Sequence, residues 1–355
     1  MSSVCLNHIN ELYLNSFCFG FRPKSEKILY PKFSQFLFRN YTFRYKVIKL
    51  AQGSTRFNIS KSKFADLKIA LPELAEQQKI ADCLSSLDEL IELQEQKLAA
   101  LKQHKKGLMQ QLFPSHNDLQ ASKQASKQAS KQASKQASKQ ASKQASKQAS
   151  NIVYPRLRFP QFKNCNGWEV VELKDIALIN PKKEKLPDDL DISFLPMSLV
   201  SEYGQVTSFE TRKVYEVKKG YTSFKNKDII FAKITPCFEN GKAALLDDLE
   251  NGYGFGSTEF HIIRSQNNCN PNFLFSYLYS DTLLTKGEKS MTGSAGQQRV
   301  PAQFFENYII AVPSTEEQQA IADCLSSLDS LISEQNQQIS NLKVHKKGLM
   351  QQLFP

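Results

Sequence analysis

The chain has 355 residues, enough for two or three domains that each bury a core, and its hydrophobic content of 41% is ordinary for a soluble protein. No apolar stretch approaches the roughly 20 residues that span a bilayer, and the N-terminus lacks the basic start of a signal peptide. The seven cysteines are scattered and form no Cys-x-x-Cys pair. We therefore expect a reduced, cytoplasmic protein without a disulfide framework or a metal site.

The net charge of +11 is unevenly distributed along the chain. Residues 1–120 carry +6 and residues 121–150 carry +7, whereas residues 151–355 carry −2. A basic segment can attract nucleic acid by displacing the counterions of phosphate, or it can simply keep the surface hydrated. Charge alone leaves both interpretations open.

A long internal repeat is the strongest signal in the sequence. The block at residues 76–88, Glu-Gln-Gln and then Ile-Ala-Asp-Cys-Leu-Ser-Ser-Leu-Asp, recurs at residues 317–329. The eleven-residue block His-Lys-Lys-Gly-Leu-Met-Gln-Gln-Leu-Phe-Pro at residues 104–114 recurs unchanged at residues 345–355. Such a repeat predicts two copies of one structural unit, and hence two similar surfaces.

Residues 1–72 are interpreted as a shortened globular module. When Pro31 is aligned with Pro271, Phe33 falls on Phe273, and a Gly-Ser pair recurs downstream in both copies. The counterpart of roughly residues 151–250 is missing before this segment. We expect a truncated copy of the later module.

Residues 73–114 and 314–355 are predicted to be long helices. Apolar residues recur in each at alternating steps of four and three, the pattern of a coiled-coil seam. Glutamines at 94 and 335 and lysines at 105 and 346 occupy the remaining seam positions. Two identical seams in one chain most simply pack against each other as an antiparallel pair, with the glutamines fixing the register. The seam residues are Ile80, Leu84, Leu87, Ile91, Leu98, Leu101, Leu108 and Leu112, and Ile321, Leu325, Leu328, Ile332, Ile339, Leu342, Leu349 and Leu353.

Residues 115–150 form a low-complexity linker that contains seven Ala-Ser-Lys-Gln tetrads. The tetrads lack large apolar residues and cannot build a core. Their composition suits an exposed helix or a fluctuating spacer. If the tract is helical, each tetrad adds ~6 Å, close to the length of two base-pair steps.

Residues 151–313 are interpreted as a complete α+β module. Short apolar runs at residues 228–232 and 260–263 predict strands, and turn-forming Asn-Gly pairs separate such runs. A helix is expected after Pro271, from residue 273 to residue 279. The overall fold class predicted is therefore α+β, with globular modules joined by two long antiparallel helices.

This arrangement resembles the specificity subunit of type I restriction-modification enzymes. The resemblance rests on Gly167 to Ile176, the turn from Gly293 to Pro301, the Pro313 to Gln319 segment, and the doubled helices. It implies a target-recognition domain that reads one half of a split double-stranded DNA site. It also implies that the helices act as a spacer and bind methyltransferase subunits, with restriction subunits joining through the complex. A second chain or an N-terminal fragment could complete the first module.

The sequence contains no recognisable catalytic apparatus. It lacks a phosphate-binding Gly-x-x-x-x-Gly-Lys-Ser/Thr loop and an Asn/Asp-Pro-Pro-aromatic tetrapeptide, so we predict no enzyme activity, no cofactor and no catalytic residues. The alternatives to a DNA-specificity subunit are a non-catalytic coiled-coil scaffold, or an inactive truncated copy without sequence preference.

Candidate DNA contacts are polar side chains on turns, because base edges and phosphates are bound by short donors, acceptors and cations. Each cluster could equally be a solvated loop. The candidates are Lys233, Thr235, Asn240 and Lys242 in one turn, Gln297, Gln298 and Arg299 in a second, and Ser54, Thr55, Arg56 and Asn58 in the shorter module.

Overall fold

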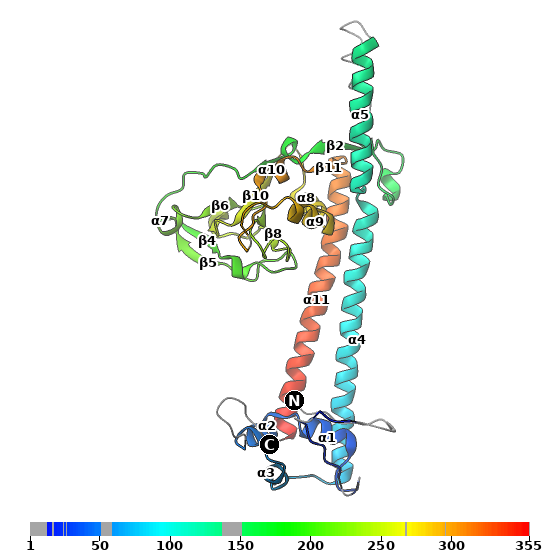
Figure 1. Cartoon of the computed structure of the whole chain (residues 1–355), viewed down its shortest axis with the longest axis vertical. Coiled ribbons are helices and arrows are strands. Elements are labelled where there is room, and N and C mark those ends of the chain that lie inside the picture. The colour runs from blue at the N-terminus through cyan, green and yellow to red at the C-terminus, as the bar shows by residue number, and fades with distance from the viewer. Residues whose placement is uncertain are drawn as a thin grey trace. The chain divides into compact units, whose positions relative to one another are not determined.

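The computed structural model divides the chain into two compact units. Unit 1 comprises Met1–Lys102 and Ser330–Pro355, and unit 2 comprises Gln103–Asp329. The structure describes residues 13–15, 18–23, 25, 27–50, 59–136, 151–266, 268–294 and 296–354. Figure 1 traces the two long helices, α4 (Leu74–Leu112) and α11 (Thr315–Leu353), each of which belongs partly to unit 1 and partly to unit 2.

The two long helices pair antiparallel, as the seam pattern predicted. In unit 1 the Gln335 amide donates a hydrogen bond to the Gln94 side-chain oxygen over 2.7 Å, and Lys346 forms a salt bridge with Asp88. In unit 2 Lys105 forms the equivalent salt bridge with Asp329 at 2.5 Å. Each seam lysine therefore meets the aspartate that the repeat places on the other helix, so both charges are compensated within the pair.

Unit 1 adds three short helices to its portions of α4 and α11. They are α1 (Pro31–Leu37), α2 (Tyr41–Ile48) and α3 (Lys61–Ala65). Proline at the start of α1 suits a position without an intrahelical N–H partner. The Asn40 side chain accepts a hydrogen bond from Phe43 N over 2.8 Å and so caps α2. The core of this unit is rich in phenylalanine and is completed by Ile80 and Leu84 of α4 and by Phe354, which follows α11.

Unit 2 contains eleven short strands in three sheets among its described residues. The first sheet has the order β1-β2-β11, the second β3-β10-β7-β8, and the third β5-β4-β9-β6. Among the strand pairs of the described residues, only β4 and β9 are parallel. The strands are β1 (Ile152–Val153), β2 (Trp168–Glu172), β3 (Ala177–Ile179), β4 (Asp191–Leu195), β5 (Glu210–Lys213), β6 (Thr222–Lys225), β7 (Asp228–Ala232), β8 (Ala243–Leu245), β9 (Tyr253–Gly256), β10 (Phe260–Ser265) and β11 (Ile309–Val312).

The helices of unit 2 cover these sheets and connect them. The α-helices are α5 (His116–Gln136), α7 (Val214–Val217), α8 (Pro271–Leu278), α9 (Asp281–Lys289) and α10 (Ala302–Glu306), and the 3-10 turns are η1 (Pro160–Phe162), η2 (Leu173–Asp175), η3 (Met197–Leu199) and η4 (Glu250–Gly252). All five residues of β7 are buried, which explains its nearly continuous apolar sequence. The predicted α+β class with two long helices is confirmed.

The tetrad tract is helical as far as the structure describes it. Helix α5 continues through Gln136, and the rest of the tract lies outside the described residues. The start of α5 is packed rather than free: Leu119 is buried in the core of unit 2, and Lys123 forms a 2.5 Å salt bridge with Glu172 on β2. The early tetrads are thus part of the folded unit.

Candidate nucleic-acid interface

The two turns predicted to contact DNA in the complete module form one continuous surface. Thr235 N donates to Gln298 O over 3.0 Å, and Val300 N donates to Lys233 O over 2.9 Å. A further β-bridge joins Ile234 to Arg299. We call residues 233–242 and 292–300 together the paired loop. The sequence predicted both turns but did not predict that they are hydrogen-bonded to each other.

The first half of the paired loop is fixed by the buried strand before it and by one aromatic anchor. Phe238 is only 1% exposed and packs against Phe305, with 6.4 Å between the ring centroids. A Cβ atom at Gly287 on α9 would lie 2.2 Å from the Phe238 ring, so this close packing requires glycine there. Asn240 stands at the tip, directly before Gly241, which has a φ of 74°. The turn at Asn240 is therefore held in place by the packing of Phe238 against Phe305 and Gly287.

The second half of the paired loop is a tight turn. Thr292 and Arg299 exchange two backbone hydrogen bonds of 3.0 and 2.9 Å, which close the turn. Gly293 has a φ of 126°, and a Cβ atom there would lie 2.9 Å from Gln297 O. Glycine at 293 is thus required by both the backbone conformation and the close approach.

Several of the predicted contact residues already have partners. Arg299 forms a forked pair with Glu259, with N–O distances of 2.9 and 2.8 Å. This guanidinium hydrogen bond lowers the pKa of the Glu259 carboxyl despite its partial burial. Asn240 donates to Glu202 over 2.9 Å, and Lys242 donates to Met197 O over 3.1 Å.

The remaining candidates in the paired loop differ in availability. Thr235 donates to Glu239 over 2.5 Å and is half-buried. The side chains of Lys233, Gln297 and Gln298 make no hydrogen bond or salt bridge within the part of the chain that the structure describes, and Gln297 is exposed. The free donors and acceptors of the paired loop are therefore concentrated where its two halves meet.

His261 on β10 contacts the paired loop through a hydrogen bond to the backbone of Val300. Its Nε2 lies 2.8 Å from Val300 O, and its Nδ1 lies 3.0 Å from the Asn180 amide nitrogen. Nε2 therefore donates and Nδ1 accepts, which defines a neutral imidazole. Burial lowers the pKa of His261, in keeping with that neutral form.

Sequence reasoning missed the acidic residues that organise this surface. Glu202, Glu239 and Glu259 accept the hydrogen bonds of Asn240, Thr235 and Arg299, respectively. Glu239 lies four residues from Thr235 and could have been found from spacing within one turn. The other two pairs are 38 and 40 residues apart and carry no local signal.

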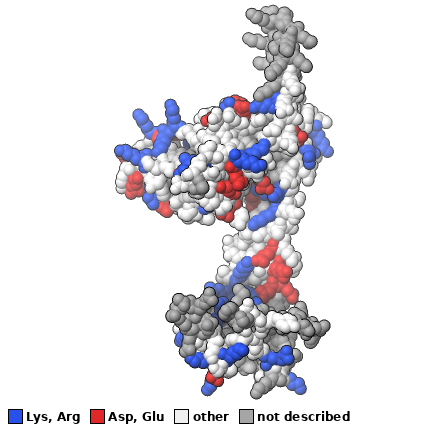
Figure 2. Space-filling model, in the orientation of Figure 1, with Lys and Arg blue, Asp and Glu red and all other residues white. Residues whose placement is uncertain are grey.

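The predicted contacts Ser54, Thr55, Arg56 and Asn58 lie outside the described residues. Within the described ranges, no group of three or more His, Cys, Asp or Glu side chains could hold a metal ion. No described helix combines the length and apolar character that a membrane crossing requires. On the face of unit 2 that Figure 2 shows, both basic and acidic side chains are present.

These features define an α+β protein with repeated long helices and a polar loop surface held on a sheet. The family model of the type I restriction modification DNA specificity domain matches residues 4–103 and 166–343, more than half of the chain. The chain therefore belongs to this family.

Curated relatives match over part of their length. The EcoAI specificity subunit of Escherichia coli is 45% identical over 189 residues, which cover 52% of this chain and 32% of that protein. The MjaVIII specificity subunit of Methanocaldococcus jannaschii is 23% identical over 323 residues, covering 84% of this chain and 63% of that protein. The chain thus spans less than two thirds of either relative.

A solved structure shares the fold. It comes from work on complex assembly and conformational transition of the type I restriction-modification system, and the match has a TM-score of 0.52. It covers 93% of this chain and 72% of that one at 13% sequence identity.

Proposed function

We propose that this chain is the non-catalytic DNA-specificity subunit of a type I restriction-modification complex. Unit 2 reads one half of a split double-stranded DNA site with the paired loop. The observation that carries this proposal is the junction of the two turns, where Thr235 N donates to Gln298 O and the side chains of Lys233, Gln297 and Gln298 have no hydrogen-bond or salt-bridge partner among the described residues. Family membership and the similarity to specificity subunits support it.

The chemistry of the paired loop suits base reading in the major groove. Glutamine and asparagine amides can form two hydrogen bonds to adenine, and arginine can do the same to guanine. Arg299 is held by Glu259, so it can contact a base only with the donors that this carboxylate leaves free or after the pair opens. Lys233 and Lys242 are suited to phosphate contacts, which position the protein without reading the sequence.

The long helices are proposed to bind methyltransferase subunits, with restriction subunits joining through the assembled complex. Leu90 on α4 and Leu331 on α11 support this assignment, because they occupy equivalent repeat positions and are 39% and 49% exposed in unit 1. An exposed leucine outside the seam adds apolar area for a partner rather than for the helix pair. Two equivalent positions suit two copies of one partner.

The test is a methylome of a host without other adenine methylation that expresses the chain with its methyltransferase subunit. We expect a defined methylated motif. Replacing both Asn240 and Gln297 with alanine should relax that motif or abolish methylation, whereas Gln161→Ala, an exposed glutamine outside the paired loop, should leave it unchanged. An assembled complex that methylates no motif would instead support the scaffold or the inactive-copy alternative.

A further inference from the structure

Units 1 and 2 hold the start of a long helix in the same way. In unit 1 the Gln77 side chain accepts from Tyr30 N over 2.9 Å and donates to Pro72 O over 2.9 Å. In unit 2 the equivalent Gln318 accepts from Asn270 N over 2.8 Å and donates to Pro313 O over 3.0 Å. The glutamine thus ties each helix start to the chain just before a short helix, α1 in unit 1 and α8 in unit 2.

The two units also receive the end of the other long helix in the same way. Phe354, after α11, packs on Phe33 of α1 with 5.3 Å between ring centroids. Phe113, after α4, packs on Phe273 of α8 with 5.8 Å between centroids. These contacts are between repeat-equivalent residues. Unit 2 is therefore a template for what unit 1 would contain if it were complete.

In unit 2, residues 151–172 contact β11, the phenylalanine at the end of α4 and the start of α11. Strand β2 of this segment pairs with β11, and the β11 residues Ile310 and Ala311 are fully buried as a result. Trp168, the first residue of β2 and the single tryptophan of the chain, is fully buried against Phe113 and Phe273.

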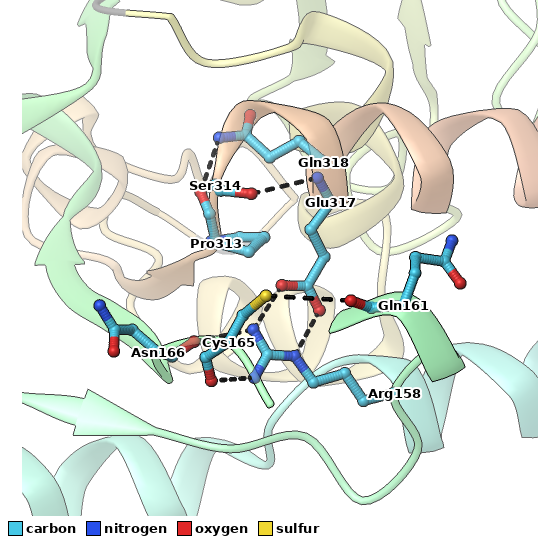
Figure 3. Close-up of polar contacts among 8 residues, drawn as sticks. All are labelled: Arg158, Gln161, Cys165, Asn166, Pro313, Ser314, Glu317 and Gln318. Carbon is cyan, nitrogen blue, oxygen red and sulfur yellow. Dashed lines mark hydrogen bonds and ion pairs between the residues drawn. The ribbon is translucent and has the colours of Figure 1, made fainter. Parts of the chain in front are cut away.

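An arginine in the same segment binds a glutamate in the first turn of α11 (Figure 3). Arg158 donates to both carboxylate oxygens of Glu317 over 2.8 and 2.7 Å, and their side chains are 8% and 1% exposed. The same guanidinium donates to Cys165 O over 2.9 Å and to Asn166 O over 2.7 Å. Among the described residues, the Glu317 carboxylate is thus satisfied by an arginine of residues 151–172.

Unit 1 has the receiving groups without this covering segment. Ile69 and Ala70 are equivalent to Ile310 and Ala311, yet Ala70 is exposed, Ile69 is half-buried, and neither belongs to a strand. Glu76 is equivalent to Glu317, yet it is exposed and its carboxylate has no partner among the residues that the structure describes. A hollow of about 350 Å³ lies against this edge, and its lining includes Ile69, Phe21 and Phe64.

We propose that residues 68–71, Glu76 and this hollow form an acceptor site for a β-strand segment from another polypeptide. The segment carries a tryptophan at the start of an apolar strand and an arginine ten residues before it, as Trp168 and Arg158 do in unit 2. Strand addition supplies backbone hydrogen bonds to the open edge, and the arginine neutralises Glu76.

The stoichiometry of the chain argues against a second copy as the donor. Each copy has two receiving edges but one tryptophan, and its residues 151–172 are already bound to its own β11. If one copy donated its residues 151–172 to unit 1 of another copy, its own β11 would lose its partner strand. Exchange between two copies would therefore leave as many edges uncovered as it covered. The proposed donor is therefore a polypeptide other than a second copy of this chain.

The experiment uses a fluorescein-labelled peptide with the sequence of residues 151–173 and measures its anisotropy with the full-length chain. We expect saturable binding of one peptide per chain. Glu76→Lys should weaken binding at least tenfold, and Ile69→Pro should do so as well, because proline removes the donor equivalent to Ile310 N. Glu73→Lys places the same charge change on the neighbouring surface and should leave binding unchanged. A peptide with Arg158→Ala should bind the chain weakly. Its affinity should be the same for Glu76→Lys as for the unsubstituted chain.

Two outcomes would overturn the proposal. The first is an equal affinity for the parent chain and the two site variants, which would mean that the peptide binds elsewhere or replaces the segment in unit 2. The second is a concentration-dependent dimer of the chain that blocks peptide binding, which would identify a second copy as the occupant. Circular dichroism checks that each variant is folded.

Discussion

The buried pair of Arg158 and Glu317 allows the sharpest test of the structure. Glu317→Gln keeps the shape of the side chain but removes its charge, which leaves the guanidinium buried against two carbonyl groups and a neutral amide. Removing one partner of a buried ion pair destabilises a protein by about 3–5 kcal/mol. Because Arg158 retains its bonds to Cys165 O and Asn166 O, we expect the lower end, about 3 kcal/mol.

Urea unfolding followed by tryptophan fluorescence measures this loss. The single tryptophan, Trp168, is fully buried in the core of unit 2, so its signal reports that unit. With a urea dependence of about 2 kcal/mol per molar, the midpoint should fall by about 1.5 M. Glu76→Gln is the matched control, and its unfolding is followed by circular dichroism because Glu76 lies in unit 1. The equivalent carboxylate is exposed there, so its loss should change stability by less than about 0.5 kcal/mol.

The reasoning is refuted if Glu317→Gln shifts the midpoint no further than Glu76→Gln does. A double variant, Arg158→Met with Glu317→Leu, separates the two possible causes of a loss. If the uncompensated charge is responsible, the double variant should be more stable than Glu317→Gln alone. If the segment is needed only for its packing, the double variant should be at least as unstable as the single one.

Three further predictions concern unit 2 and the tetrad tract. Hydrogen bonds from Lys123 and then Lys174 lower the pKa of Glu172 from 4.5 to about 2. Glu172 is therefore protonated in the unfolded chain at a higher pH than in the folded chain, so the stability of unit 2 should fall as the pH drops from about 4.5 towards 2. In an acid titration of Trp168 fluorescence, the fall should be smaller for Glu172→Gln. Gly293→Ala should destabilise unit 2 by about 1–3 kcal/mol in urea unfolding, because the φ of residue 293 is 126° and the new Cβ would lie 2.9 Å from Gln297 O. An unchanged urea midpoint would contradict the geometry of that turn. Deleting one tetrad after Lys123 shortens a helix by ~6 Å and should reduce the gap of a bipartite methylated motif by about two base pairs; an unchanged gap would show that the tract does not act as a helical spacer.

The parts of the fold that depend on local periodicity could be predicted from the sequence. The seam with its glutamine pair is an example, because a 3.5-residue period and one polar position suffice to define the register. The strand predicted at residues 228–232 coincides with β7, and the helix predicted from residue 273 overlaps α8, Pro271–Leu278. These elements have apolar patterns that no tertiary contact contradicts.

The partners of the site residues could not be predicted, because they are determined by sheet pairing. Arg299 meets Glu259 only because the paired loop lies at the end of β10, next to β7. The same holds for His261, whose ring reaches Val300 across 39 residues of sequence. A single sequence carries no signal for such pairs, so a candidate chosen as a free arginine proved to be one half of an ion pair.

The identical endings of the two helices have a physical explanation in these contacts. Residues 104–114 end α4 and contribute Leu108, Met109 and Phe113 to the core of unit 2, while residues 345–355 end α11 and contribute Leu349, Met350 and Phe354 to the core of unit 1. Equivalent side chains can pack well in both places only if the receiving cores are equivalent. The cores agree at the helix starts, at the phenylalanine pairs and at the glutamine bonds, and they differ at the edge that β2 covers in unit 2. That difference leaves Ala70 exposed and the Glu76 carboxylate without a partner among the described residues, so the repeat itself supports the position and the chemistry proposed for the added segment.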